Sequence, residues 1–164
     1  MAYVSLDSDQ IKKAHKKHKY SKTQVEQLEK CMDEKDGPLF FMKSFMKIQH
    51  PVKGSIPFKP FPYQERLIAS YNDHRFSIAM LPRQTGKTTC ASGFLIWYAM
   101  FKPDSQILIA AHKYAGASDI MSRVRYAYEM LPAWIKAGVT QYNRNSIEFD
   151  NGSKISATTT TENT

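Results

Sequence analysis

The spacing of hydrophobic positions changes about a third of the way along the chain. Before residue 60 it is helical: Val25, Leu28 and Met32 follow Ser21-Lys-Thr-Gln24, a capping-box pattern that starts a helix. Apolar positions between Phe40 and Ile48 predict a second helix with one apolar face. Four prolines between residues 51 and 62 then predict an extended connection.

After residue 61 the pattern alternates between helical spacing and short apolar runs. It predicts helices and buried strands in the order helix 63–71, strand 76–81, helix 87–101, strand 106–111 and helix 115–131. Strands that are apolar throughout and separated by helices are typical of an α/β fold with a parallel sheet flanked by helices. We therefore expect an N-terminal helical segment over residues 1–60 and an α/β domain over residues 61–164.

The end of the chain has a different pattern. Ser146-Ile-Glu-Phe-Asp150 and Ser153-Lys-Ile-Ser156 alternate polar and apolar residues on either side of Asn151-Gly152. Asn-Gly favours the type I′ turn of a two-residue hairpin. The sequence thus predicts a C-terminal β-hairpin beside the parallel sheet.

Composition narrows the class of protein. A chain of 164 residues with 42% hydrophobic residues can bury a core, and its longest apolar run, 94–101, is too short for a membrane span of about 20 residues. No secretory signal precedes it, so we expect a protein of the cytoplasm with reduced thiols at Cys31 and Cys90.

The charge pattern is compatible with a polyanionic partner. The net charge is +8, and residues 1–60 contribute most of it, with twelve lysines against seven acidic residues. The run from Lys12 to Lys19 favours a solvated helix face or frayed terminus over a DNA contact. On the last helix, Arg125 and Glu129 have the spacing of a helical salt bridge.

The segment Leu81-Pro-Arg-Gln-Thr-Gly-Lys-Thr-Thr89 lies between a predicted strand and a predicted helix, as a phosphate-binding loop requires. Gly86 permits close backbone approach, Lys87 would reach the β- and γ-phosphates of ATP, and the Thr88 hydroxyl would complete the shell of Mg²⁺. Backbone N–H groups of the same loop would cradle the phosphates, which adds the following residues to the predicted site: Gln84, Thr85 and Thr89. Leu81 stands where such loops usually have their first glycine.

Met80 to Thr89 resembles the deviant Walker A loop of the large terminases of T-even-type tailed phages, most closely those of cyanobacterial myoviruses. That family also lacks the first glycine and carries an arginine inside the loop, so the resemblance implies that Arg83 contacts the nucleotide phosphates in cis. A surface arginine is the alternative interpretation. The resemblance covers residues 21–164, is strongest over 61–160, and implies a P-loop NTPase of the RecA/helicase-like (ASCE) class.

Phe61-Pro-Tyr-Gln64 resembles the adenine-recognition motif of the same family. A glutamine amide can donate to N7 of adenine and accept from N6, so Gln64 would read the base while Tyr63 stacks on it. The alternative interpretation is that the same residues form an ordinary helix start with no role in adenine recognition.

No segment has the pattern of a Walker B strand with its Asp-Glu pair, and the nuclease domain of the family is absent too. The P-loop fold is therefore expected to be incomplete, either because the chain is truncated or because a second chain carries the rest. The resemblance implies an N-terminal ATP-binding part of the motor that moves viral DNA into the prohead, with double-stranded viral DNA, portal protein and small terminase subunit as partners. Two alternatives are a fragment of a helicase-like DNA translocase and a non-catalytic nucleotide-binding or decoy module.

Overall fold

Five helices, a four-stranded sheet and a two-stranded hairpin make up the part of the chain that the computed structural model describes, residues 10–160. In chain order the elements are α1 (Lys22–Met32), α2 (Gly37–Phe45), β1 (Lys47–His50), β2 (Gly54–Pro57), α3 (Pro62–Asp73), α4 (Lys87–Phe101), β3 (Gln106–Ala111), α5 (Tyr114–Glu129), β4 (Val139–Tyr142), β5 (Ser146–Phe149) and β6 (Lys154–Thr159).

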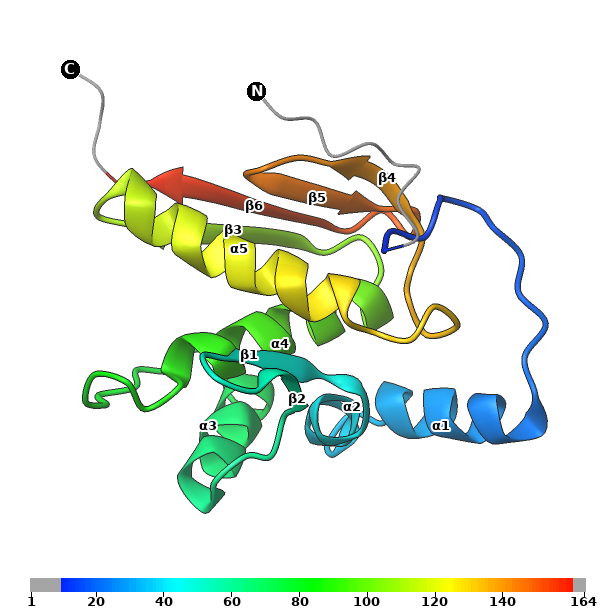
Figure 1. Cartoon of the computed structure of the whole chain (residues 1–164), viewed down its shortest axis with the longest axis horizontal. Helices are drawn as coiled ribbons and strands as arrows, with labels where there is room; N and C mark the ends of the chain where they lie inside the picture. The colour runs from blue at the N-terminus through cyan, green and yellow to red at the C-terminus, as the bar shows by residue number, and fades with distance from the viewer. Residues whose placement is uncertain (1–9, 161–164) are drawn as a thin grey trace.

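The elements form layers (Figure 1). The sheet β3–β6 lies on one side, α5 and α4 pack beneath it, and α1, α2, α3 and the β1–β2 hairpin lie on the opposite side of α4. The sheet is covered by helices on one face, since Leu108, which points from the other face of β3, is 65% exposed. The molecule is thus an α/β structure with one covered sheet face.

Helix α4 lies at the centre of these layers. Its sequence has no polar face, and Ile96, Trp97 and Ala99 are completely buried. The indole nitrogen of Trp97 donates to the carbonyl of Cys31, at 2.7 Å, which ties α4 to the end of α1. The predicted bounds 87–101 are confirmed for this helix.

The other predicted helices are largely confirmed as well. Ser21 and Gln24 form the expected capping box, with the Gln24 N–H donating to the Ser21 hydroxyl at 3.2 Å and the Ser21 N–H to Oε1 of Gln24 at 3.0 Å. Helices α3 and α5 lie within two residues of their predicted ends. Helix α2, in contrast, ends at Phe45, and Ile48 belongs to β1.

The four-stranded sheet is mixed, with the order β3-β6-β5-β4. Strands β3 and β6 are parallel, from Gln106 beside Lys154 to Ala111 beside Thr159, whereas β5 is antiparallel to both of its neighbours. The prediction of a parallel sheet is therefore correct for one pair of strands only. The C-terminal hairpin supplies the antiparallel pair β5–β6, and it places β6 parallel to β3.

The predicted strand 76–81 does not form. Phe76, Ile78 and Met80 are 82%, 95% and 93% exposed, and the segment has no strand assignment. A strand exists only through hydrogen bonds to a neighbouring strand, and between residues 10 and 160 this segment pairs with none, although β3 is an edge strand whose single partner is β6. The prediction was wrong because a short run of apolar residues does not by itself provide a neighbouring strand.

The turn between β5 and β6 differs from the predicted type I′ turn. Gly152 has φ of +83°, but Asn151 does not adopt a positive φ, which type I′ would require at both positions. The Gly152 N–H donates to the Phe149 carbonyl at 3.1 Å, as in a three-residue loop with a glycine bulge. The side chain of Asn151 instead donates to the carbonyls of Ala99 and Met100, so it caps the C-terminal end of α4.

The β1–β2 hairpin was not predicted, because its prolines suggested an extended connection. Its turn is held by His50, whose Nδ1 accepts the N–H groups of Val52 at 3.2 Å and Lys53 at 3.1 Å. Gly54 closes the turn with φ of +68°. The hairpin packs close to α5 and becomes one wall of a cavity described below.

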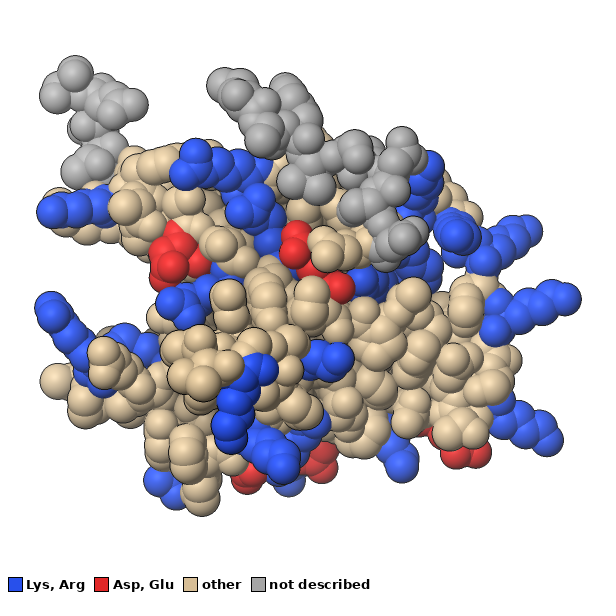
Figure 2. Space-filling model, viewed as in Figure 1, with Lys and Arg blue, Asp and Glu red and all other residues tan. Residues whose placement is uncertain are grey.

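The basic N-terminal run begins as an anchored segment rather than a helix. The Val139 N–H donates to the Lys12 carbonyl at 2.9 Å, and the Lys12 ammonium donates to the Lys136 carbonyl at 2.8 Å. The rest of the run, residues 16–19, is exposed. Lysine and arginine side chains are distributed over both the helical layers and the sheet layer of the visible face (Figure 2), so the charge is not gathered into one patch there.

Both cysteines are buried and free. Burial raises the pKa of the Cys31 thiol to about 12 and that of the Cys90 thiol to about 11. The thiols are therefore protonated at neutral pH and act as small apolar groups of the core.

The exposure of segment 76–81 is testable by a matched pair of substitutions. Ile78→Ala should change the free energy of unfolding by less than about 0.5 kcal/mol, because the side chain is already in water. Ile96→Ala, at a fully buried position, should lower it by about 2–5 kcal/mol. Urea unfolding followed by circular dichroism measures both, and equal losses would mean that Ile78 is packed as a core strand.

Candidate functional site

The predicted phosphate loop leads directly into α4. Gly86 is the N-cap residue, with φ of +75°, and Lys87 is the first residue of the helix. No side chain caps this helix end, so the N–H groups of the first turn are open toward the loop. An uncapped helix N-terminus favours an anion, because its N–H groups are unpaired and the positive end of the helix dipole lies there.

The loop is closed by its own hydrogen bonds. The ammonium of Lys87 donates to the carbonyls of Leu81 at 3.3 Å and Pro82 at 3.2 Å. The Thr85 hydroxyl donates to the Pro82 carbonyl at 3.0 Å. Lys87 is thus folded over the loop, in the place where it could exchange these carbonyls for phosphate oxygens.

Tyr63 and Gln64 hold the loop from α3. The Tyr63 hydroxyl and the Gln64 amide both donate to the carbonyl of Thr85, at 2.9 and 3.0 Å. Gln64 is buried, and its Oε1 accepts the N–H of Phe61 at 3.0 Å, which caps α3. A Cβ on Gly86 would come within 2.6 Å of the Gln64 amide nitrogen, so this close approach requires glycine.

The structure therefore brings together the two motifs that the sequence placed apart. Tyr63 lies parallel to Phe61, with ring centroids 5.9 Å apart, so an aromatic pair stands beside the loop. The role of Tyr63 and Gln64 toward adenine stays a prediction, while their contact with Thr85 was not foreseen. The spacing from Phe61 to Gln64 could have indicated the bond between Gln64 and the Phe61 N–H, but no local signal indicated the contact with Thr85.

The remaining predicted site residues lie in the loop and on the first turn of α4. Arg83 and Gln84 are exposed, and Gln84 adopts φ of +62°. Thr88 and Thr89 are half-buried on the first turn of α4. A cradle of open N–H groups, Gly86 and Lys87 fits a nucleotide phosphate, and Thr88 is the hydroxyl nearest in sequence for its Mg²⁺.

A further prediction concerned a salt bridge on the last helix. Arg125 was expected to pair with Glu129, but the Glu129 carboxylate accepts the Tyr142 hydroxyl at 2.7 Å, and this contact joins α5 to β4. The ion pair on α5 is instead Asp119–Arg123, at 3.1 Å. Among residues 10–160 no group of three His, Cys, Asp or Glu side chains could hold a metal ion.

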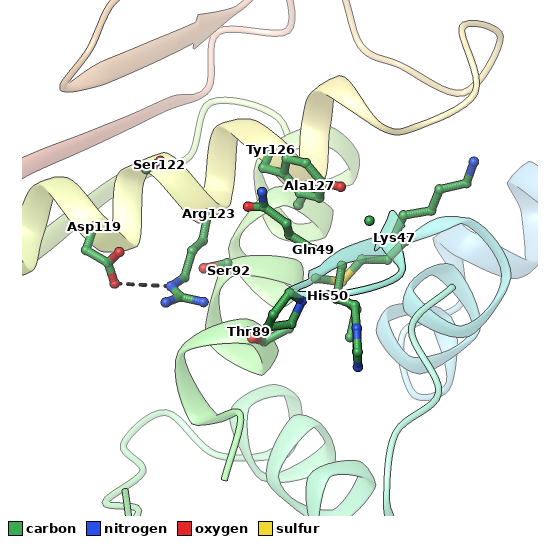
Figure 3. Close-up of a pocket in the computed structure, with 14 residues that line it drawn as sticks. Lys47, Gln49, His50, Thr89, Ser92, Asp119, Ser122, Arg123, Tyr126 and Ala127 are labelled. Atoms are coloured by element: carbon green, nitrogen blue, oxygen red, sulfur yellow. Dashed lines mark hydrogen bonds and ion pairs between the residues drawn. The ribbon is translucent and has the colours of Figure 1, made fainter. Parts of the chain in front are cut away.

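A cavity of about 580 Å³ lies on the other side of the first turns of α4. Figure 3 shows its walls: Thr89 and Ser92 from α4, Asp119 and Arg123 from α5, and Gln49 from the β1–β2 hairpin. Sequence reasoning missed this cavity, since it depends on a hairpin that the sequence did not reveal. Thr89 is the only predicted site residue in its lining.

A family model described as "Terminase large subunit, T4likevirus-type, N-terminal" matches residues 78–164, which is more than half of the chain. The matched region contains the whole loop from Leu81 to Thr89 and all of the four-stranded sheet. The chain belongs to this terminase family.

Large terminases package the DNA of tailed phages, so viral DNA and packaging proteins are the partners of the family in general. Membership favours a terminase over the alternative of a helicase-like translocase. The match does not include Tyr63 and Gln64, which the structure joins to the matched region through Thr85. Within the described part of this terminase chain, no helix is both long and apolar enough to cross a membrane.

The clamp on Thr85 can be tested with two glutamines. Gln64→Ala should lower the free energy of unfolding by about 1–3 kcal/mol, because it removes two hydrogen bonds of about 0.5–1.5 kcal/mol each, one to the Phe61 N–H and one to the Thr85 carbonyl. Gln84→Ala, in the exposed loop, should change it by less than about 0.5 kcal/mol. Chemical denaturation gives both values. An unchanged free energy of unfolding in Gln64→Ala would mean that the contact with Thr85 does not stabilise the loop.

Proposed function

We propose that this chain is the N-terminal ATP-binding part of a phage terminase large subunit, the motor that moves viral DNA into the prohead. The observation that carries the proposal is the uncapped N-terminus of α4, with Gly86 as its N-cap and Lys87 folded over the loop. These features are those expected of a P-loop NTPase, although segment 76–81 forms no strand before the loop, and the family match over the same residues supports that class.

In this proposal each residue has a separate task. Lys87 leaves the Leu81 and Pro82 carbonyls and neutralises the β- and γ-phosphates, while the first-turn N–H groups of α4 cradle them. The Thr88 hydroxyl holds Mg²⁺, which neutralises developing charge on the phosphates when it is bound. Arg83 is exposed next to the loop and is proposed to contact the phosphates in cis.

Base recognition is proposed for Tyr63 and Gln64. Both already touch the loop at Thr85, so an adenine bound there would lie next to the phosphates on Lys87. The Gln64 amide would exchange the Thr85 carbonyl for the base, and its Oε1 is shared with the α3 cap. This arrangement links base binding to the position of the loop.

The proposal includes the partners that the sequence implied. A packaging motor acts on double-stranded DNA in the host cytoplasm together with a portal protein and a small terminase subunit. A second chain is one of the two explanations for the missing Walker B strand, and Phe76, Ile78 and Met80 offer it an exposed apolar surface to cover. A nucleotide-binding or decoy module without turnover differs from this proposal in having no such partner chain.

ATP binding is the first test. In calorimetry with ATP and Mg²⁺, Lys87→Ala should weaken binding about tenfold or more, because a hydrogen bond to a charged group is worth about 1.5–3 kcal/mol. Lys22→Ala on α1, an exposed lysine remote from the loop in sequence, is the matched control and should bind as the unmodified chain does. Equal affinities for Lys87→Ala and Lys22→Ala, both folded, would refute the phosphate-loop assignment.

Turnover is the second test, and we expect none from this chain alone. The acidic residues of β5 and its turn are already engaged: Glu148 pairs with Lys154 at 2.7 Å, and Asp150 accepts the His15 N–H at 2.9 Å. Neither is placed at the tip of a parallel strand to orient water toward a phosphate. Phosphate release from ATP that Lys87→Ala abolishes would contradict this expectation and identify a catalytic acid within the chain.

A further inference from the structure

The cavity beside α4 has a chemistry of its own. Its polar walls come from three separate elements, and its apolar floor comes from Met46, Ile48 and Ala127. A volume of about 580 Å³ lies within the usual range for small-molecule sites, about 300–1,000 Å³. A ligand that fits must therefore combine a flat or apolar body with polar groups at one end.

Arg123 supplies the strongest group for such a ligand. Its Nε donates to Asp119 Oδ2 at 3.1 Å, and this bond fixes the guanidinium at the wall of the cavity (Figure 3). The terminal nitrogens carry further N–H donors in a planar fork, which suits the two oxygens of a phosphate. The Lys47 side chain extends away from these groups, so Arg123 is the cation that addresses the cavity.

The neighbouring polar groups have hydrogen-bonding capacity to spare. In the part of the chain that the structure describes, the hydroxyls of Thr89, Ser122 and Tyr126 make no hydrogen bond with protein. The Ser92 hydroxyl, in contrast, donates a hydrogen bond to the Thr88 carbonyl at 2.8 Å. Tyr126 also offers an aromatic ring, and a ring next to an arginine is the pairing that binds a base together with its phosphate.

We propose that this cavity binds a nucleoside phosphate unit, with the phosphate on Arg123 and the base against Tyr126 and the apolar floor. The unit can come from a free nucleotide or from a nucleic acid strand, since both present the same base and phosphate. The site is separate from the phosphate loop, and it shares with the loop only the first turn of α4, through Thr89. Its occupancy does not depend on Lys87.

The test uses the whole chain with Lys87→Ala, which removes the proposed ATP site. Two probes are titrated by calorimetry: AMP, for a free nucleotide, and a ten-residue oligothymidylate, for a strand. Saturable binding of AMP supports the free source, and saturable binding of the oligothymidylate alone supports the strand. Absence of saturable binding by either probe at millimolar concentration would overturn the proposal.

Three substitutions then place the binding in the cavity. Arg123→Ala should weaken it about tenfold or more, since it removes a charge-assisted hydrogen bond. Ser122→Trp should weaken it by filling the space, whereas Asp119→Asn should tighten it by removing the carboxylate that competes for Arg123. The opposite direction for Asp119→Asn separates a ligand on Arg123 from a merely structural ion pair.

Arg66→Ala on α3 is the matched control, because Arg66 is an exposed helical arginine outside the lining. Equal losses for Arg66→Ala and Arg123→Ala would mean diffuse electrostatic attraction and would overturn the cavity assignment. Binding that needs Lys87 but not Arg123 would likewise overturn it while supporting the phosphate loop. Binding that needs Arg123 but not Lys87 would support the cavity even if the proposed ATP site failed.

Discussion

The packing of α4 between two layers is the constraint on which the rest of the structure depends. A helix with no polar face is stable in water only when other elements cover most of it, and here the two flanking layers leave Tyr98, at 38%, as its exposed large side chain. Trp97 is the anchor of this arrangement, because it is fully buried and its indole N–H reaches the Cys31 carbonyl. The Asn151 side chain completes it by capping the C-terminal end of the helix.

A helix fixed in this way also fixes the position of its N-terminus. The Gly86 N-cap and the Lys87 ammonium are therefore presented at one place, and the loop before them is held by Tyr63 and Gln64 rather than by a preceding strand. Such a clamp lowers the entropy that the loop would lose on binding an anion. The internal bonds of Lys87 act in the opposite direction, because a phosphate must replace both carbonyls.

The first turn of α4 has two different surroundings. Lys87 belongs to the proposed phosphate loop, and Thr89, two residues later, lines the cavity together with Arg123. Ligands at two such sites are linked in free energy whenever binding at one displaces the shared turn, and the linkage is equal in both directions. The second site depends on the β1–β2 hairpin, because this hairpin lies next to α5 and forms one wall of the cavity.

The sequence by itself determined the features that depend on local chemistry. These are the capping box of α1, the bounds of α4, the hairpin of β5 and β6, and a phosphate-loop pattern whose residues lie within the matched terminase family. Each follows from side-chain spacing within a few turns or strands, where propensity and capping act directly.

Only the tertiary structure decided which distant groups meet. The apolar segment 76–81 pairs with no strand of the described residues, whereas β6 pairs with β3 across almost fifty residues. The Gln64 amide nitrogen donates to the Thr85 carbonyl, and its Oε1 accepts the Phe61 N–H at the start of α3. Arg123 forms its ion pair with Asp119. Hydrogen-bond partners of this kind are chosen by proximity in the folded chain, which no local pattern of residues specifies.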